Sequence, residues 1–302
     1  MLDLSVIILT YNEEIHIRRC LDNVSPIATK VFIIDSYSTD RTLEIAGEYD
    51  NVEILQNKWE NNHAKQFNWG LEHADIHTKW VLKLDADEYL TSELIQELEN
   101  KLPSVSEGVT GFQLPLRRVF LGKTLRRGLP PIILLRIFQY GKGKSELRLM
   151  DEHIQLTEGI TYQTEYEFAD DNLNDLSWWT QKHIGYAIRE AIDLLDIELD
   201  LTGAGATDDN KQIGEQALAK RKLKHKYVRL PLFWRAFAYF CNRYFLHLGF
   251  LEGKEGFLWH FLQGWWYRTL VDAKIFEIKK ACGNDKEKIR LYIKKKYNIS
   301  LE

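Results

Sequence analysis

The sequence predicts an α/β domain built on a mostly parallel sheet with helices on both faces, followed by a helical C-terminal region. In the first half, short apolar runs rich in β-branched residues alternate with segments of helical spacing. Strands separated by helices of this length connect through right-handed crossovers, which makes them parallel. Strand patterns end near residue 170, so we expect the α/β domain over residues 1–165 and the helical region over residues 166–302.

Four strands are predicted to be buried on both faces, because each is a short and almost continuous apolar run. They cover residues 4–9, 31–34, 52–55 and 80–84, with helical spacing over residues 15–24, 39–46 and 64–74. Two more strands are expected over residues 111–117 and 132–138, joined by a basic loop that contains Arg117, Arg118, Lys123, Arg126 and Arg127. A helix over residues 178–199 and a linker over residues 202–209 follow.

The composition is that of an ordinary globular protein. Of the 302 residues, 45% are hydrophobic and 28% are charged, which excludes a disordered chain, a collagen-like repeat and a disulfide scaffold. Lys and Arg total 40 against 44 Asp and Glu, so the net charge of −4 gives no field that favours nucleic acid as a partner. The three cysteines lack zinc-ligand spacing and follow no signal-peptide pattern, so we expect a cytoplasmic setting.

Acids, amides and hydroxyls follow three of the predicted strands. Ligands of a parallel sheet bind outside the carboxyl ends of its strands, so these groups are expected to form one binding rim. The three groups are Thr10-Tyr11-Asn12-Glu13-Glu14, Asp35-Ser36-Tyr37-Ser38-Thr39-Asp40 and Asp85-Ala86-Asp87-Glu88.

The acids after the fourth strand are the strongest indication of chemistry. Adjacent carboxylates at the end of a buried strand repel one another unless a cation neutralises them. Oxygen ligands suit Mg²⁺ or Mn²⁺, which take one or two carboxylates together with substrate phosphates. Capping of the next helix is the alternative, and it accounts for Glu88 but not for Asp85, which is still tied to its strand.

Asp35 is the corresponding acid after the second strand. A carboxylate at a strand end can accept hydrogen bonds from ribose hydroxyls or from a base N–H, whereas Ser38 and Thr39 are more typical of a loop and helix cap. The chain has neither a G-x-G-x-x-G nor a G-x-x-x-x-G-K-[ST] loop, so neither a dinucleotide oxidoreductase nor a P-loop enzyme is indicated.

Three of these segments resemble family-2 glycosyltransferases with the GT-A fold. They are Val6–Glu13, Asp35–Asp40 and Asp85-Ala86-Asp87, and the resemblance extends over about residues 1–160. It is strongest to the branch that builds lipopolysaccharide core and other bacterial envelope glycans. The resemblance implies a nucleotide pocket lined by Thr10, Asn12 and Glu13, with Tyr11 near the base, Asp35 and Ser36 at the uracil or ribose end, Asp85 and Ala86 near the ribose, and Asp87 on the cation.

Lys65 and one acidic segment complete the set that the resemblance implies, and three arginines are candidates from their residue type alone. Lys65 would neutralise diphosphate charge, with an exposed helix lysine as the alternative. Arg126, Arg127 and Arg136 would grip a phosphate or belong to a solvated loop. Asp151-Glu152-His153 resembles the acidic base motif of the family, although many members have the order Glu-Asp. By position Glu152 is the favoured general base, with Asp151 second, and His153 either completes the ligand set of the cation or caps a turn.

The implied activity is the inverting transfer of one sugar from a nucleotide-sugar to a hydroxyl of a lipid-linked or glycan acceptor, and the favoured donor is a UDP-sugar. Mg²⁺ or Mn²⁺ is the implied cofactor. Two alternatives stay open. A sugar-phosphate nucleotidyltransferase has a similar architecture but a glycine-rich, basic loop after its first strand, which Thr10–Glu14 is not. A non-catalytic glycan- or lipid-binding scaffold would keep the fold without turnover.

The C-terminal third is rich in aromatic residues. They are concentrated between Tyr227 and Tyr267 and follow the basic run Lys220–Lys226, a combination that suits contact with an anionic membrane surface. No apolar stretch reaches the ~20 residues of a spanning helix. A helical subdomain that packs its aromatic residues inward is the alternative.

Overall fold

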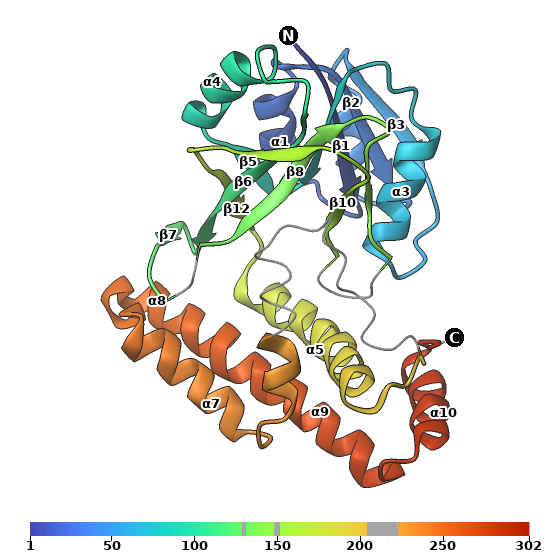
Figure 1. Cartoon of the computed structure of the whole chain (residues 1–302), viewed down its shortest axis with the longest axis vertical. Coiled ribbons are helices and arrows are strands. Elements are labelled where there is room, and N and C mark those ends of the chain that lie inside the picture. Colours follow the sequence, from blue (N-terminus) through green and yellow to red (C-terminus); the bar gives the residue numbers. More distant parts are fainter. Residues whose placement is uncertain (129–130, 148–151, 204–222, 302) are drawn as a thin grey trace. The chain divides into compact units, whose positions relative to one another are not determined.

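The computed structural model describes residues 1–128, 131–147, 152–203 and 223–301, and Figure 1 traces the whole chain. Two compact units are present. The sheet unit comprises Met1–Leu125 and Pro131–Leu173, and the helical unit contains the described residues 126–128, 174–203 and 223–301. The predicted α/β class with a helical C-terminal region is confirmed, while the linker expected over residues 202–209 lies, beyond residue 203, outside the described residues.

Four parallel strands form the part of the sheet that the sequence predicts. They are β1 (Leu2–Thr10), β2 (Ala28–Asp35), β3 (Val52–Gln56) and β4 (Trp80–Asp85), in the spatial order β3-β2-β1-β4. β1 is flanked by β2 and β4, and all three have almost uninterrupted buried side chains, as expected for strands covered on both faces.

The rest of the sheet is mixed. β8 (Ile133–Gln139) runs antiparallel to both β4 and β6 (Val109–Phe120). β6 also pairs with the short strands β7 (Lys123–Leu125), β11 (Ile160–Gln163) and β12 (Phe168–Asp171), and β12 pairs in turn with β5 (Glu88–Leu90). β9 (Gly143–Ser145) and β10 (Ile154–Leu156) form a separate hairpin.

Two expectations about this half need correction. Arg117 and Arg118 lie within β6 rather than in the basic loop, because β6 continues to Phe120 and pairs there with β7. The sheet also reaches Asp171, beyond the expected boundary at residue 165, because the four-residue strand β12 fits between β6 and β5. A strand this short leaves no periodicity in the sequence to detect.

Helices cover both faces of the parallel strands (Figure 1). α1 (Ile17–Val24) and α4 (Ser92–Lys101) share one core with Val6, Ile8 and Val31. α3 (His63–His73) packs Phe67 on the opposite face, in a core with Ile7 and Phe32. Successive residues of β1 therefore enter different cores, as the alternation of a strand requires. A short helix, α2 (Thr42–Ala46), follows β2.

The helical unit has its own core. α5 (Leu176–Leu199), α9 (Tyr267–Cys282) and α10 (Lys286–Tyr297) pack through apolar side chains such as Leu195, Val271 and Ile289. The remaining elements are α7 (Trp234–Cys241), the π-helix η1 (Asn242–Leu246), the 3₁₀ turn η2 (Gly249–Glu252), α8 (Gly253–Trp259) and the π-helix η3 (His260–Trp266). Within the described residues, no helix is both long and apolar enough to cross a bilayer.

A buried ion pair joins α7 to α9. Arg235 lies 2.5 Å from Asp272 and donates a hydrogen bond from Nε to Oδ1 of the same carboxylate, and both side chains are almost fully buried. The backbone N–H of Phe233 donates to Oδ2 of Asp272 at 2.7 Å. Asp272 thus satisfies both the guanidinium and the start of α7, so removing its charge leaves a buried cation without compensation.

We expect Asp272→Asn to lower the free energy of unfolding by about 3–5 kcal/mol, because breaking one side of a buried pair exposes the full desolvation cost of the other. Urea unfolding of the full chain, followed by circular dichroism, measures this. Glu53→Gln is the control, because its pair with Lys30 is partly exposed and should change stability by less than about 1 kcal/mol. Equal effects of the two substitutions would contradict the assignment.

Candidate functional site

The ends of three neighbouring strands form the site. In the register of the sheet, Thr10 of β1 is opposite Asp35 of β2, and Leu9 of β1 is opposite Asp85 of β4. The groups that follow β1, β2 and β4 therefore lie side by side at the carboxyl edge of the sheet, as the sequence predicts.

Asp35 is fully buried at this edge and is a hub of hydrogen bonds. Its carboxylate accepts from Thr10 Oγ1 at 3.0 Å, from the backbone N–H and Oγ of Ser38 at 2.9 and 2.5 Å, and from Gln56 Nε2 at 3.2 Å. A buried carboxylate requires this number of donors to offset its lost hydration. Asp35 therefore fixes the loop after β2, and both of its oxygens already have protein partners.

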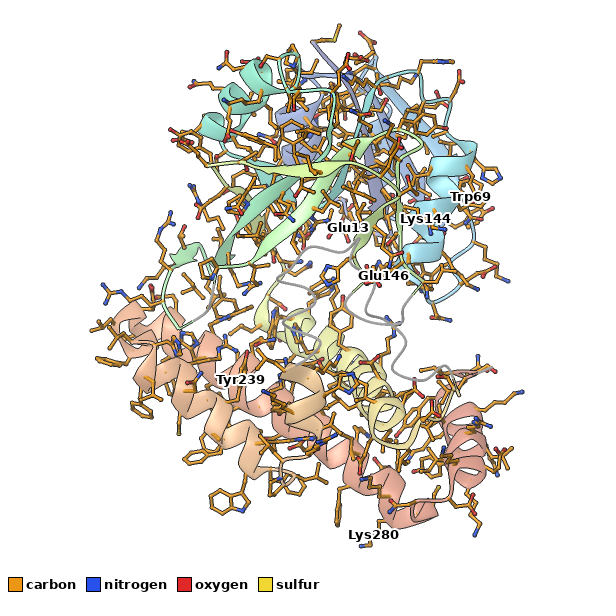
Figure 2. The ribbon with its side chains drawn as sticks, in the orientation of Figure 1. Glu13, Trp69, Lys144, Glu146, Tyr239 and Lys280 are labelled. Atoms are coloured by element: carbon orange, nitrogen blue, oxygen red, sulfur yellow. The ribbon has the colours of Figure 1, made fainter. Side chains whose placement is uncertain are left out.

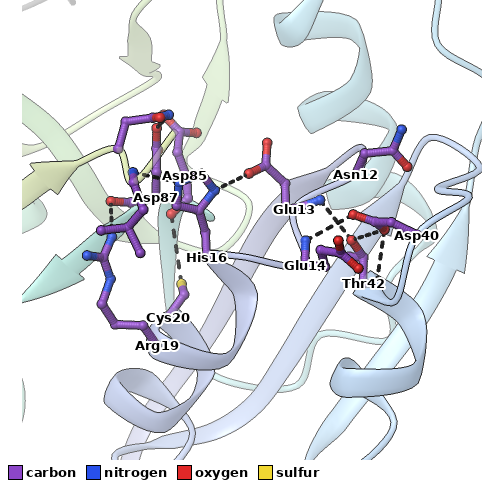
Figure 3. A network of polar contacts seen from close by, with 12 residues as sticks. Asn12, Glu13, Glu14, His16, Arg19, Cys20, Asp40, Thr42, Asp85 and Asp87 are labelled. Atoms are coloured by element: carbon purple, nitrogen blue, oxygen red, sulfur yellow. Dashed lines mark hydrogen bonds and ion pairs between the residues drawn. The ribbon is translucent and has the colours of Figure 1, made fainter. Parts of the chain in front are cut away.

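The loop after β1 is tied to the loop after β2 (Figure 3). Asn12 adopts a left-handed conformation with φ of 56°, and its Oδ1 accepts the backbone N–H of Thr39 at 2.8 Å. The backbone N–H of Glu13 donates to Thr42 Oγ1 at 2.8 Å, and that of Glu14 donates to Asp40 at 3.1 Å. These bonds hold the rim rigid before any ligand arrives.

Aromatic and hydroxyl groups complete this part of the rim. Tyr11 and Tyr37, which follow β1 and β2, are both exposed. Ser36 accepts a hydrogen bond from Gln66 Nε2 on α3 at 3.1 Å. Lys65, also on α3, is exposed and pairs with Glu60 at 3.0 Å. The structure thus gives Lys65 a carboxylate partner of its own on the segment before α3.

The turn after β4 is organised around a buried glutamate. Oε2 of Glu88 accepts the backbone N–H of Asp85 at 2.9 Å, and Oε1 lies 2.5 Å from Arg136 on β8. The same guanidinium is 3.6 Å from the Asp85 carboxylate. Burial raises the pKa of Glu88 well above its ordinary value, Arg136 opposes the rise, and Asp85 and Asp87 add to it.

Two sequence alternatives are wrong here. Glu88 does not cap the next helix, because it lies in β5, and Thr91 Oγ1 caps α4 by accepting the backbone N–H of Leu94. Arg136 is not part of a solvated loop, because it is buried in β8. The physical reason is the same for both residues: the buried Glu88 needs a counter-charge, and Arg136 supplies it.

Asp87 is held from two sides. Its Oδ2 accepts Asn172 Nδ2 at 2.8 Å, and its carbonyl accepts Arg19 Nη2 at 3.1 Å. Arg19 also pairs with Asp171 at 2.7 Å (Figure 3 shows Arg19 beside Asp87). Arg19 on α1 and Asn172 after β12 therefore position Asp87, which lies between β4 and β5. Ala86, between the two predicted acids, is buried.

Asp170 brings a further carboxylate into this group. It is opposite Glu88 of β5 and Arg118 of β6 in the register of the sheet. Burial, and then repulsion by Asp87, raise its pKa to about 6, against the lowering effect of Arg118. In the part of the chain that the structure describes, the ends of β4 and β12 thus carry five carboxylates, and the cations beside them are Arg19, Arg118 and Arg136.

The donor set fits a magnesium-type cation without forming a complete cage. Among residues 1–128, 131–147, 152–203 and 223–301, no three His, Cys, Asp or Glu side chains are placed to hold one metal ion. Mg²⁺ and Mn²⁺ need only one or two carboxylates when substrate phosphates and water supply the other oxygens. Asp87 and Asp85 are the carboxylates at this edge that could supply those ligands, and Asp170 and Glu88 lie beside them on neighbouring strands.

The acidic segment of residues 151–153 is described only in part. Glu152 lies 3.7 Å from Lys83 Nζ on β4, and it is among the carboxylates that raise the pKa of Arg136 against the effect of burial, after Glu88 and Asp85. Asp151 lies outside the described residues. The backbone N–H of Glu146, which Figure 2 labels, donates to the carbonyl of His153, and the backbone N–H of His153 donates to Oε1 of Glu146. The structure thus brings Glu152 electrostatically near the Asp85 group, and it records no metal set that contains His153.

Comparison with known proteins decides the family. The model of the family described as Glycosyl transferase family 2 matches residues 5–175, more than half of the chain. This chain belongs to glycosyl transferase family 2. The predicted family is therefore confirmed, and the matched segment contains Asp35, Asp85, Asp87 and Glu152.

Sequence relatives within the family are distant. The SPbeta prophage-derived glycosyltransferase SunS of Bacillus subtilis (strain 168) is 34% identical over 87 residues, which are 28% of this chain and 20% of SunS. The chain thus spans about a fifth of the length of SunS. An uncharacterized glycosyltransferase of Rickettsia bellii (strain RML369-C) is 24% identical over 288 residues, or 93% of this chain and 88% of the relative.

Solved structures that resemble this family-2 chain are equally distant. S. aureus TarS (residues 1–349) covers 99% of this chain and 91% of its own, with 16% identity and a TM-score of 0.43. Glucosyl-3-phosphoglycerate synthase from Mycobacterium tuberculosis, solved with Mn²⁺, UDP and glucosyl-3-phosphoglycerate, covers 39% of this chain and 44% of its own. Its identity is 19% and its TM-score 0.30.

Sequence reasoning missed the residues that hold the acids in place. These are Arg19, Lys83, Asp170, Asp171 and Asn172, together with His16, which is fully buried between Glu13 and the backbone N–H of Leu173. One signal was present, since Asp170-Asp171-Asn172 repeats the pattern of acids and amides that follows the other strands. This pattern could not be assigned to the site from the sequence, because the strand β12 that carries it was not predicted.

The electrostatics of Asp170 give a pH-dependent prediction. Its pKa in the folded protein, about 6, lies above its ordinary value of 3.8, so its contribution to stability is lost as the pH rises through this interval. In EDTA, we expect Asp170→Asn to equal the wild type near pH 4 and to exceed it by on the order of 2 kcal/mol above pH 6. Urea unfolding across this pH range measures the difference.

The control is Asp50→Asn, which removes an exposed carboxylate and should leave the difference from wild type near zero at every pH. An Asp170→Asn protein that is less stable than the wild type at pH 7 would show that Asp170 is stabilised as an anion, and would contradict the excess of negative charge.

Proposed function

We propose that this chain transfers one sugar from a nucleotide-sugar to a hydroxyl of a lipid-linked or glycan acceptor, with inversion at the anomeric carbon. The favoured donor is a UDP-sugar. The observation that carries the proposal is the excess of carboxylates over cations at the ends of β4 and β12, where the sheet brings Asp85, Asp87, Glu88 and Asp170 together. Such an excess favours binding of a divalent cation, and a cation at this edge of the sheet suits a diphosphate.

In this proposal Asp87, with Asp85 beside it, would hold Mg²⁺ or Mn²⁺. When bound, the cation would neutralise the charge that develops on the departing nucleoside diphosphate. Asn172 and Arg19 hold Asp87 through Oδ2 and the backbone carbonyl, and no hydrogen bond to Oδ1 is recorded from any residue that the structure describes. This leaves one oxygen of a rigidly held carboxylate for a ligand.

The rim after β1 and β2 would bind the nucleoside. Its loops are already joined by the hydrogen bonds of Asn12, Glu13 and Glu14, and the exposed rings of Tyr11 and Tyr37 offer faces on which a base can stack. Asp35 contributes by fixing this loop. Its direct contact with the uracil or ribose stays a prediction, and so does neutralisation of the diphosphate by Lys65.

Glu152 would act as general base. The acceptor hydroxyl would attack the anomeric carbon, its proton would pass to the Glu152 carboxylate, and the bond from that carbon to the diphosphate oxygen would break. Lys83, 3.7 Å from Glu152, would fix the direction of the carboxylate. Asp151 remains the second choice on the same segment.

The donor site is tested by thermal shift. We expect UDP with Mn²⁺ to raise the Tm of the wild type in proportion to the logarithm of ligand concentration, because ligands that bind only the folded state stabilise it by mass action. Asp87→Asn should lose most of this increase, since it removes the charge that holds the cation. Asp50→Asn is the control and should keep the full increase. An undiminished shift for Asp87→Asn would contradict the proposed cation site.

The general base is tested by turnover. We expect Glu152→Gln to lower kcat by about 10²- to 10⁴-fold, the usual contribution of a general base, while the Tm increase with UDP and Mn²⁺ is retained. Release of UDP from donors, in the presence of an extract of acceptor glycolipids, measures the rate. Asp151→Asn is the matched variant. If it abolishes turnover while Glu152→Gln does not, the two roles are reversed.

A further inference from the structure

The helical unit carries an apolar surface that is not covered by other described residues. It lies on α7, η1, η2 and α8, and Figure 2 shows the side chains of this region, with Tyr239 labelled on α7. Large side chains are exposed along it, including Trp234 at 71% and Leu246 at 77%. We name as the aromatic surface the exposed residues Trp234, Phe237, Phe245, Leu246, Leu248, Phe250, Leu251 and Phe257.

The rings of this surface are continuous with one another. Trp234 contacts Phe237, and Phe237 contacts Trp265 of η3, with ring centroids 6.4 and 5.1 Å apart. Tyr244 joins the other end, with centroids 6.3 Å from Phe250 and 5.8 Å from Phe257. Phe261 of η3 links the two groups, with its ring centroid 5.9 Å from that of Trp265 and 6.0 Å from that of Phe257. The rings thus form one connected series over α7, α8 and η3 instead of scattered single residues, and contiguous apolar patches mark interaction sites.

Polarity is inverted in α7 and η1. The charged residues point inward, since Arg235 is 3% exposed and Arg243 is 2% exposed, and they pair with Asp272 and Gln263. The outward positions instead carry Trp234 and Phe245. A helix on a water-facing surface shows the opposite arrangement. The inversion indicates that the outer face of α7 and η1 has an apolar environment.

The charge of this segment identifies that environment. Residues 223–251 contain no Asp or Glu and five Lys and Arg, of which Arg235 and Arg243 face inward, although the whole chain carries a net charge of −4. Lys226 and Arg229, which precede Trp234 in the chain, and Lys254, which lies between Leu251 and Phe257, are exposed. Aromatic rings bordered by basic side chains match the interface of an anionic bilayer, where the rings enter the headgroup region and the cations contact lipid phosphates.

We propose that the aromatic surface docks on an anionic lipid bilayer and lies in its interface without crossing it. This inference rests on the proposed function, because docking on a membrane would bring the site to a lipid-linked acceptor, whose hydroxyl is presented there. A protein partner fits less well. Of the two acids within residues 234–257, Glu252 is buried and Glu255 is half-buried, so the surface presents little negative charge to a basic partner, and its rings extend over several short helical segments instead of lining a groove.

Vesicle flotation tests the proposal. We expect the full chain to float with vesicles of equal phosphatidylglycerol and phosphatidylcholine at low salt, and to bind more weakly to phosphatidylcholine alone or at high salt, because screening reduces the electrostatic part. Trp234→Ser combined with Leu246→Ser should reduce partitioning at least about tenfold, since two large side chains no longer enter the interface.

Leu291→Ser is the matched control. Leu291 lies on α10 and is 66% exposed, so the change removes an exposed leucine away from the aromatic surface and should leave vesicle binding within about twofold of wild type. Absence of wild-type flotation at low salt would overturn the proposal, and so would equal binding of the double variant. A dimer in light scattering without lipid that the double variant abolishes would also overturn it, because the surface would then bind a second copy.

The donor assay separates this proposal from the proposed function. If UDP and Mn²⁺ raise the Tm while no vesicles bind, the membrane surface fails and the donor site stands. If vesicles bind through the aromatic surface while UDP and Mn²⁺ leave the Tm unchanged, the proposed transfer fails and the membrane surface stands.

Discussion

Repulsion among carboxylates at the ends of β4 and β12 is the constraint on which the site depends. Burial, together with the charges of Asp85 and Asp87, raises the pKa of Glu88 and of Asp170, so this part of the fold requires compensation. Arg136 compensates Glu88 from within the sheet. The charge that remains near Asp87 and Asp170 is the basis for a cation and, through it, a diphosphate.

The two units handle charge differently. In the sheet unit, buried cations hold acids at the edge of the sheet, so that unbalanced negative charge remains where a ligand can bind. In the helical unit, Arg235 forms a buried ion pair with Asp272, and the outer face of α7 and η1 is apolar. The first arrangement suits a small charged ligand, and the second suits an extended apolar surface.

The sequence predicted the elements that have strong patterns. The continuous apolar runs located β1, β2, β3 and β4, and the parallel arrangement that follows from them located the three acidic and polar groups at one edge. The roles of Arg19, Arg136 and Asn172 beside these acids could not be predicted, because they depend on the pairing of β8 and β12 with strands distant in sequence. Glu88 was misread for the same reason, since the counter-charge that keeps it buried is supplied by β8.

The central claim is that Asp87 holds a divalent cation beside a nucleoside diphosphate. A crystal of the full chain soaked with MnCl₂ and UDP, with data collected at the manganese absorption edge, tests it most directly. The account predicts an anomalous peak within about 2.5 Å of an Asp87 carboxylate oxygen, with diphosphate oxygens on the same ion. An ordered UDP with no manganese at Asp87, or a manganese bound at a distant surface site, would contradict it.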